Sequence, residues 1–583
     1  MMPADTTPRF PTPFEFNFRY PIPLIELRMW RLSGQIRSKP NWWNKVQDPD
    51  LAVKWRKEMV EQDAAIVDRF WGGPKRFESD VIATGDKWQW PRSKITDPQL
   101  DYIFDQLRYE ATRYNSTTGI FAAAVPKVYE SRSLIPATLK ASLLDGVSVL
   151  ESVPDEDKDW HPGSNKQVLD LVHPSMYCLR IGESYVKSRD DTPGADSVTV
   201  ITEEEYMRQR PDMDRFRRPG LDYVISPKFQ WLPTDFQVSE SGDVTALSYI
   251  NSLHPTHHRV LYPTISSIFS RFIPLFENVL GDAISPEPPT AVRPKPNSWY
   301  KHTYTQHSSV PRPYDEPDPN DSAFIDVPWC GKWPYVPEPV PFQPPSTEGR
   351  TTISLRGRTL QVIVKLANIV LTPGDNPAYP GGSWHVEGMA NEAIVATGLY
   401  YYACENITKS RLDFRGAVGS EENGVHLDYE QSDDTGYMLV FGLQRDSFLN
   451  QRFGGIIAEE GKCIAFPNIY QHRVDAFELV DPTKPGHRKI LCFFLVDPFT
   501  KVLSTRDVPP QQEDWAAEAL GEARSLQLLP QELFDIVVDY TREGKVSRKE
   551  AEDVREQLMA ERSTFVVEHN KELFEVEFYM CEH

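Results

Sequence analysis

Cysteine is scarce in this sequence: only six occur among 583 residues, at positions 178, 330, 404, 463, 492 and 581. No two of them form a C-x-x-C pair, which is the spacing typical of zinc ribbons and thioredoxin-like redox motifs. We therefore interpret them as reduced thiols. Zinc-ribbon and thioredoxin-like motifs therefore have no support, and the length of 583 residues excludes a small disulfide-stapled fold.

Long apolar runs and an excess of basic charge are also missing. No uninterrupted apolar stretch approaches the ~20 residues that a bilayer requires, and the first residues, MMPADTTPRFPTPFEF, lack the basic-then-apolar order of a signal peptide. Lys and Arg number 63 against 84 Asp and Glu, and the resulting net charge of −21 would repel a phosphate backbone. We therefore expect a soluble intracellular protein, cytoplasmic or nuclear, that binds neither membrane nor nucleic acid.

Proline is abundant, and its distribution divides the chain. Of the 50 prolines, 16 lie between positions 286 and 345, where a regular helix or a central strand could not persist. The same stretch contains Trp299, Trp329 and Trp333, and a solvated linker seldom carries so much apolar surface. We predict an extended strap, residues 284–346, that packs across a domain surface.

The region before this strap, residues 1–283, reads as mixed but mainly helical. Apolar residues recur at helical spacing over 40–72 and 97–114, with Asp near the helix starts. Residues 245–280 begin with a strand-like TALSYINSL and continue as a helical ISSIFSRFIPLFENVL, despite the proline within it. The sequence therefore predicts amphipathic helices with a few strands.

The region after the strap has a different pattern. Residues 347–505 contain short β-rich runs separated by turns, among them TLQVIVKLANIVL, AIVATGLYYYA, GYMLVFGL, CIAFPNIY and KILCFFLV. This spacing favours a β-sandwich or barrel. Helical spacing returns over 506–583, where Pro530 and Ser547 stand at predicted helix starts.

A candidate metal site lies in the β-rich region. Residues two apart on an extended segment point to the same side, so His385 and Glu387 could both bind one cation. His472, which follows the predicted strand CIAFPNIY, would supply a third ligand from a distant strand. Two histidines and one carboxylate form the facial triad of non-haem Fe(II) oxygenases, and zinc with the same ligands is the alternative.

A cation would be needed if this metal held 2-oxoglutarate. Arg488 opens the strand RKILCFFLVDP and offers a bidentate fork for the distal carboxylate. A tight hairpin before that strand would, however, place Arg488 roughly 23 Å from His472 at 3.3 Å per residue. Either the segment DPTKPGH forms a wider loop, or Lys365 or Arg415 takes this role.

Other groups of polar residues are weighed against this site. His426 and Asp428 form a rival H-x-D pair, although the Asp, Ser, Gly and Asn around them are typical of a solvated turn. The histidines of SLHPTHHRV are interpreted as a turn before a helix, because we expect no acidic or cysteine partner nearby. The three consecutive tyrosines at 400–402 are interpreted mainly as packing surface.

The order of the candidate motif resembles that of the double-stranded β-helix Fe(II)/2-oxoglutarate-dependent dioxygenases. In this chain the H-x-E pair is followed by GKCIAFPN, the distal histidine and a basic residue on the next strand. More closely, FQWLPTDF, SYINSLHP, GGSWHVEGMANEAIVATGLYYYACENI, LDFRGAV and VPPQQEDW resemble a large two-part family of unknown function, found mainly in filamentous fungi. This likeness covers nearly the whole chain.

The resemblance to the oxygenases implies both a fold and a function. The expected fold is α+β, with a double-stranded β-helix (jelly-roll or cupin-like) core over 347–505, a helix-rich N-terminal region and C-terminal helices. His385, Glu387 and His472 would bind Fe(II), and Arg488 or Lys365 would bind 2-oxoglutarate. Such a non-haem dioxygenase would oxidise an unactivated C–H bond of a small molecule, by default through hydroxylation. The alternatives are a non-catalytic cupin-like scaffold and a zinc hydrolase.

Overall fold

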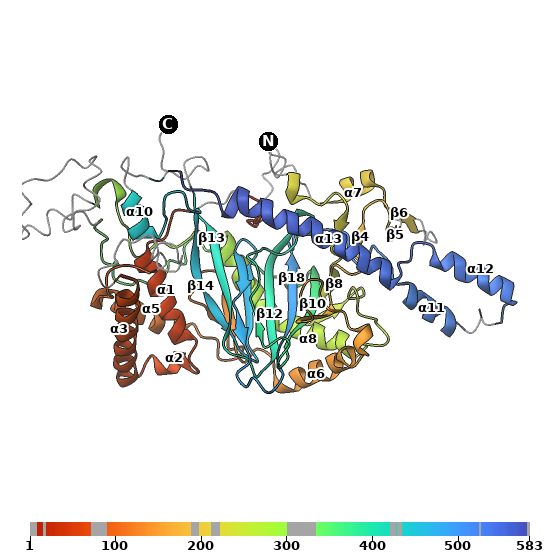
Figure 1. The fold of residues 1–583 in the computed structure, drawn as a ribbon, viewed down its shortest axis with the longest axis horizontal. Helices are drawn as coiled ribbons and strands as arrows, with labels where there is room; N and C mark the ends of the chain where they lie inside the picture. The colour runs from red at the N-terminus through yellow and green to blue at the C-terminus, as the bar shows by residue number, and fades with distance from the viewer. Residues whose placement is uncertain are drawn as a thin grey trace, which may run out of the picture.

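Two antiparallel sheets form the centre of the molecule, and helices surround them (Figure 1). The computed structural model describes residues 8–15, 19–71, 90–187, 198–210, 222–299, 334–419, 427, 434–523, 526 and 528–579. The described helices are α1 (Leu24–Arg37), α2 (Trp42–Lys45), α3 (Pro49–Trp71), α5 (Asp97–Thr112), α6 (Ala137–Glu151), α7 (Glu203–Gln209), α8 (Leu261–Ile284), α10 (Asp434–Phe441), α11 (Glu513–Glu522), α12 (Gln531–Arg542) and α13 (Arg548–His569).

The large sheet has nine strands, in the order β1-β2-β15-β12-β18-β10-β8-β9, with β3 also paired to β10. Its strands are β1 (Phe121–Ala122), β2 (Tyr129–Ser131), β3 (Val168–Val172), β8 (Thr234–Val238), β9 (Val244–Ala246), β10 (Thr359–Leu371), β12 (Ile394–Glu405), β15 (Cys463–Pro467) and β18 (Gly486–Val496). All of these pairings are antiparallel, and the described strands do not close into a barrel. The architecture is therefore mixed α+β, built on a large open antiparallel sheet.

A smaller sheet faces the large one. Its order is β14-β13-β16, and β11 pairs with β17 beside it. These strands are β13 (Ser410–Ala417), β14 (Asn450–Ala458), β16 (Gln471–Val474), β11 (Ala378–Tyr379) and β17 (Phe477–Glu478). Two further antiparallel pairs lie outside both sheets: β4 (Leu179–Arg180) with β7 (Phe229–Gln230), and β5 (Tyr185–Lys187) with β6 (Val198–Val200).

The central strands are apolar along their whole length because both faces of the large sheet are covered. Leu366 of β10 and Phe493 of β18 point to one face, where they pack on α8 with its Phe269. Phe494 of β18 points to the other face and shares a cluster with Phe414 of the smaller sheet. Sheets covered on both sides carry near-continuous hydrophobic runs rather than an alternating pattern. The space between the two sheets is therefore a packed interior, into which one face of each sheet points.

One predicted strand was wrong, and another is only partly confirmed. GYMLVFGL forms helix α10, because Tyr437, Val440 and Phe441 recur at helical spacing and pack together with Trp299. TALSYINSL keeps only the strand β9, because the hydroxyl of Ser248 takes the place of a backbone partner and accepts the N–H of Asp235. The helix starts predicted at Pro530 and Ser547 are confirmed as the caps of α12 and α13.

The proline-rich strap is described only at its ends, and residues 300–333, including Trp329 and Trp333, lie outside the described residues. Val292 and Trp299 on the first part are buried. On the second part, Phe342 packs against Tyr102 and Tyr109 of α5. Val292 and Phe342 therefore pack on the N-terminal helices, whereas Trp299 packs on α10. The boundaries 284–346 and 347–505 remain a prediction.

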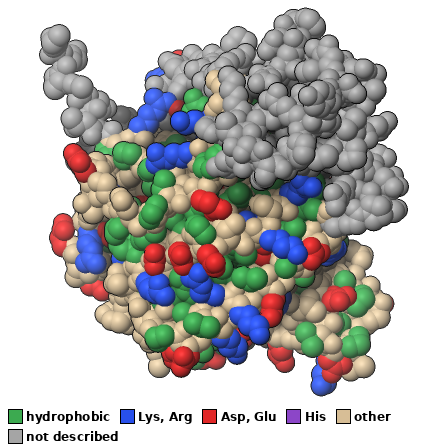
Figure 2. Space-filling view, turned by 90° about the vertical axis from the view of Figure 1, so that its left-hand side faces the viewer, with side chains coloured by type: hydrophobic (Ala, Val, Ile, Leu, Met, Phe, Trp, Pro, Cys, Tyr) green, Lys and Arg blue, Asp and Glu red, His purple; other side chains and the backbone are tan. Residues whose placement is uncertain are grey.

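The surface of the helical end mixes both signs of charge. Figure 2 views the molecule from the side of α3, and acidic and basic side chains are interspersed over the described part of this face. Pairs such as Arg56 with Asp101 and Lys94 with Asp68 account for this mixture. None of the described helices combines the length and apolarity needed to cross a bilayer. The absence of a nucleic-acid partner remains a prediction.

Acid is expected to destabilise the fold through His569, at the end of α13. Its ring packs among aromatic side chains, including Phe565 and Phe574, and burial lowers its pKa from 6.5 to about 3. Because the folded-state pKa lies below the unfolded one, the stability that depends on the neutral ring is complete above pH ~6.5. It is lost as the pH falls towards 3, by about 2 kcal/mol at pH 5. Urea unfolding at pH 7.5 and pH 5 measures the loss.

The matched variant is His569→Phe, which keeps an aromatic ring and removes the titrating group. Its free energy of unfolding should fall by about 2 kcal/mol less than that of the wild type between the two pH values. An equal fall in both proteins would contradict the assignment to His569.

Candidate metal centre

The backbone itself brings His385 beside His472. His385 lies beyond β11, and forms an isolated antiparallel bridge with His472 on β16. The N–H of His385 donates to the carbonyl of His472 at 3.2 Å, and the reciprocal bond measures 3.0 Å. On its other side, β16 pairs with β13, where Phe414 stands opposite His472. Two histidines far apart in the sequence are therefore fixed as direct neighbours at the edge of the smaller sheet.

Glu387 completes a cluster of three ligand-type side chains. Its Oε1 lies 3.3 Å from Nε2 of His472 and 3.9 Å from Nε2 of His385. One donor atom from each residue lies within 4.8 Å of the other two. Two ligands that each stand ~2.1 Å from one ion are about 3.0 Å apart in a right-angled arrangement and about 3.4 Å apart in a tetrahedral one. The longer glutamate side chain thus reaches the two imidazoles at distances close to those of a bound metal.

A hydrogen bond from Nδ1 of His385 leaves its Nε2, the nitrogen that faces Glu387, free to bind a metal. Its Nδ1 lies 2.9 Å from the carbonyl oxygen of Ser383, which can only accept, so Nδ1 carries the proton. The lone pair of Nε2 then points towards Glu387. A metal-bound histidine usually donates its other ring N–H in this way. Nδ1 of His472 is buried without a partner among the described residues.

The pKa values favour the protonation states that a metal needs. Burial alone would raise the pKa of Glu387, but the hydrogen bond to His472 and the nearby imidazoles outweigh it and lower the pKa to about 2. Burial, reinforced by repulsion from His472, lowers the pKa of His385 to about 4. At neutral pH the carboxylate is therefore ionised and the His385 imidazole is neutral.

Asn468 holds the backbone of Glu387 in place. Its Oδ1 accepts the N–H of Glu387 at 2.9 Å, and its Nδ2 donates to the carbonyl of Glu387 at 2.9 Å and to that of Ile394 at 3.1 Å. The side chain is fully buried. Asn468 is the last residue of GKCIAFPN, so this motif supplies a clamp for the H-x-E segment as well as the strand that precedes His472.

Arg488 is a buried cation without an acidic partner in the described part of the chain. It is 2% exposed, donates to the hydroxyl of Ser410 at 2.6 Å, and lies over the rings of Tyr401 and Phe477. A buried charge is costly unless an opposite charge accompanies it. The thiol of Cys492, on the same face of β18, interacts electrostatically with both Glu387 and Arg488. Arg488 is thus suited to receive an anion near the cluster.

The tight hairpin considered before Arg488 does not form. β18 pairs with β12 and β10 of the large sheet, whereas β16 belongs to the smaller one. The amide of Asn406 donates to the carbonyls of Asp481 and Lys484 and holds the connecting loop. The wider-loop alternative is therefore correct, and the 23 Å separation does not apply.

The two substitute cations differ in their surroundings. Lys365 stands opposite Cys492 on β10, and the described residues give its ammonium no hydrogen bond or ion pair. It interacts electrostatically with Glu387 on one side and Asp170 on the other. Arg415 instead is bonded to Glu575 and to Gln471, and stands next to Phe414 on β13, so it faces the opposite side of that strand. Lys365 therefore remains a candidate for anion binding, and Arg415 does not.

A second cluster joins His254 and His257 to Glu518 of α11. The turn predicted before α8 is confirmed, but the statement that no acidic partner lies nearby was wrong, because Glu518 is distant only in sequence. Nδ1 of His254 accepts the N–H groups of Thr256 and His257 at 3.2 and 3.3 Å. Its Nε2 therefore carries the proton and donates towards Glu518. This cluster is held by hydrogen bonds in a tautomer unsuited to a metal.

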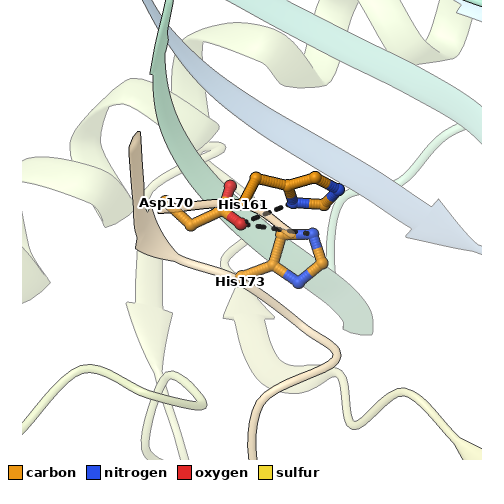
Figure 3. Close-up of side chains that lie close together, drawn as sticks. All are labelled: His161, Asp170 and His173. Atoms are coloured by element: carbon orange, nitrogen blue, oxygen red, sulfur yellow. Dashed lines mark hydrogen bonds and ion pairs between the residues drawn. The ribbon is translucent and has the colours of Figure 1, made fainter. Parts of the chain in front are cut away.

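The third cluster, His161, Asp170 and His173, escaped the sequence analysis altogether (Figure 3). Asp170 Oδ2 lies 2.7 Å from Nδ1 of His161 and 4.0 Å from Nε2 of His173. Nδ1 of His173 accepts the N–H of Ser175 at 3.2 Å, so its Nε2 also carries a proton. Arg555 Nη1 stands 4.0 Å from the same carboxylate. Asp170 thus already has a cationic neighbour. In the cluster at His385, by contrast, the Nε2 of His385 is left without a proton because its Nδ1 donates to the carbonyl of Ser383.

The remaining sequence candidates have simpler outcomes. His426 and Asp428 lie outside the described residues. Tyr400 and Tyr402 pack in the core against α8, as expected, and Tyr401 lies on the opposite face beneath Arg488.

Comparison with known proteins places the chain in a family without naming an activity. No curated protein matches it. A crystal structure of a bsmA homologue from Methylobium petroleophilum aligns over 63% of this chain and 87% of its own, at 9% identity and a TM-score of 0.20. The selenomethionine-labelled Fe(II)/α-ketoglutarate-dependent dioxygenase TqaL aligns over 63% and 92%, at 10% identity and a TM-score of 0.19. With TM-scores this low, neither likeness supports a conclusion about this chain.

The match to a sequence family is extensive and has two parts, as the motifs indicated. Residues 1–58 match the N-terminal domain of unknown function DUF4246, and residues 97–519 match the protein of unknown function DUF4246. Because the larger match covers well over half of the chain, this protein belongs to the DUF4246 family of proteins of unknown function.

Proposed function

We propose that this protein is an Fe(II)- and 2-oxoglutarate-dependent oxygenase that oxidises an unactivated C–H bond of a small molecule. The observation that carries the proposal is the combination of the His385, Glu387 and His472 cluster with Arg488, a buried cation that lacks an acidic partner in the described residues. A metal site alone would equally suit a zinc hydrolase. A buried cation near it favours an enzyme that also binds an anionic cosubstrate.

The strand order supports a double-stranded β-helix as the scaffold. Along the chain, β10, β12, β15 and β18 add to the large sheet in the order β15-β12-β18-β10. The intervening β13, β14 and β16 form the smaller sheet, which His385 joins through its bridge to His472. A chain that passes repeatedly between two facing antiparallel sheets is the arrangement of a jelly roll. The metal cluster would then lie at the mouth of the space between the sheets.

The charges near the cluster suit a dicarboxylate. Lys365 and Arg488 are two cations that β10 and β18 direct towards this space, and neither makes an ion pair in the described part of the chain. An anion with two carboxylate groups would compensate both. We assign the distal carboxylate to Arg488, because its fork is the more buried, and place Lys365 nearer the metal, because it interacts electrostatically with Glu387.

The protein's contribution would be to bind, orient and exclude water. Iron and 2-oxoglutarate, when bound, would together supply the oxidant for the C–H bond. Ser383 fixes the tautomer of His385, and Asn468 fixes the backbone of Glu387. The ring of Phe466 packs edge-on against His472, with centroids 4.9 Å apart, and screens it from solvent. Fixed ligands and the exclusion of water limit side reactions of a reactive intermediate.

Anaerobic spectroscopy tests the proposal directly. Fe(II) followed by 2-oxoglutarate should produce a weak visible charge-transfer band in the wild-type protein, and His385→Ala should lose it because the metal loses a ligand. The matched control is His254→Ala in the second cluster, which should keep the band.

Two results would contradict the proposal. A wild-type protein that shows no band but retains one equivalent of zinc through purification would be a zinc protein instead. A protein that binds neither metal would indicate a non-catalytic scaffold.

A further inference from the structure

The C-terminal segment, residues 548–575, consists of α13 and the π-helical turn Asn570–Phe574 that follows it. It lies outside the residues that match the family, 97–519, yet it runs across the ends of the central strands (Figure 1). Val554 and Leu558 of α13 pack into the same apolar cluster as the facing sides of the two sheets. This segment therefore covers the space on which the metal cluster borders.

Arg562 connects this segment to the turn after Glu387. Its Nη2 donates to Oε1 of Glu392 at 2.7 Å, and its guanidinium lies 3.7 Å from the ring centre of Trp231. Oε2 of Glu392 in turn accepts the N–H of Met389 at 2.6 Å. The carboxylate of Glu392 therefore fixes the backbone two residues beyond Glu387.

This turn has little freedom to adopt another shape. Gly388 has a φ of +69°, in the left-handed region that disfavours other residues, and a Cβ there would stand 2.8 Å from Ile394 Cδ1. The side chain of Glu392 is fully buried, and Arg562 is its cationic partner among the described residues. Loss of that partner would leave a buried carboxylate that keeps the N–H groups of Met389 and Trp231 but lacks an opposite charge, which favours its movement towards solvent.

A second set of contacts reaches His472 from the other side. Gln471, the residue before it, donates from Nε2 to Oδ1 of Asn570 at 2.6 Å. Oε1 of Gln471 accepts from Arg415, which is bonded to Glu575 at 2.7 Å. The turn after α13 thus holds the start of β16.

We infer that residues 548–575 complete the metal centre, with Arg562 as a positioning residue that acts on Glu387 through Glu392. This inference rests on the proposed function, because it concerns the same three ligands. It goes beyond that proposal in assigning part of the site to a segment outside the family match. Arg562 touches neither the ligands nor a substrate, and its effect is on the position of the carboxylate.

Co(II) binding to the full-length protein, followed by visible absorption, tests this inference. Arg562→Met should weaken Co(II) binding ~10- to 100-fold, the range typical when an outer partner of a metal ligand is lost. Arg562→Lys should recover most of the affinity, because it restores the charge beside Glu392. Arg548→Met, at the exposed start of the same helix, should bind Co(II) like the wild type.

The Co(II) titrations distinguish a failure of this inference from a failure of the proposed function. A wild-type protein that does not bind Co(II) would overturn the proposed function. Equal affinity in wild type and folded Arg562→Met would overturn this inference alone, since a merely structural role lowers the urea midpoint without changing the affinity of the folded protein. If Arg562→Met fails to fold, Asn570→Ala takes its place. It should weaken Co(II) binding by the same factor, and an unchanged Co(II) affinity would again overturn this inference.

Discussion

Replacing Glu387 with glutamine is expected to weaken Fe(II) binding by more than the ~100-fold that loss of an outer partner can cost. Glu387 is the one carboxylate in the cluster. Its Oε1 lies 3.3 Å from Nε2 of His472 and 3.9 Å from Nε2 of His385. Its low pKa shows that this environment stabilises a negative charge, which a neutral amide cannot supply. Anaerobic equilibrium dialysis against Fe(II) measures the affinity.

The control for this change is Glu518→Gln, in the cluster with His254 and His257. It also removes one carboxylate next to two imidazoles, but from a cluster whose His254 tautomer is unsuited to metal binding. Fe(II) affinity should therefore remain at the wild-type value. If Glu518→Gln reduces Fe(II) binding and Glu387→Gln does not, our assignment is wrong and the metal binds at the cluster of His254, His257 and Glu518.

Part of the grouping of His385, Glu387 and His472 could be predicted from the sequence, because it depends on local geometry. Two-residue alternation places His385 and Glu387 on one side of any extended segment. The turn-strand pattern of GKCIAFPN then fixes where His472 begins the next strand. What the pattern did not contain was the backbone bridge between His385 and His472, which depends on how the two sheets come together.

The errors arose where distant residues decide local structure. The turn before β18 could have been a tight hairpin or a wider loop, and the sequence could not decide between them because Asn406, from the loop after β12, holds this segment. GYMLVFGL has the composition of a strand, and becomes a helix because Tyr437 and Phe441 pack on one side. Likewise, neither the pairing of Glu518 with His257 nor that of Arg562 with Glu392 has a sequence signal, since each joins residues more than 150 positions apart.

Arg488→Met is expected to weaken 2-oxoglutarate binding about 100-fold, which corresponds to ~2.7 kcal/mol, while Fe(II) affinity stays unchanged. The guanidinium would pair with the distal carboxylate, and methionine can fill its place between Tyr401 and Phe477 without offering a charge. Titration of the visible band with 2-oxoglutarate gives the affinity. Lys365→Met, at the less buried cation, should reduce the affinity less.

The resistance of Arg488→Met to urea is a second measurement, and it is not expected to fall as the affinity for 2-oxoglutarate does. In the cosubstrate-free protein the described residues give Arg488 a neutral hydroxyl but no acidic partner, so the buried charge costs free energy. Arg488→Met should therefore unfold at an equal or higher urea concentration than the wild type, although it binds 2-oxoglutarate more weakly. A residue kept for structure would show the reverse: lower stability with unchanged cosubstrate affinity. Because the two roles predict different results in both measurements, one pair of titrations decides whether Arg488 is an anion-binding residue.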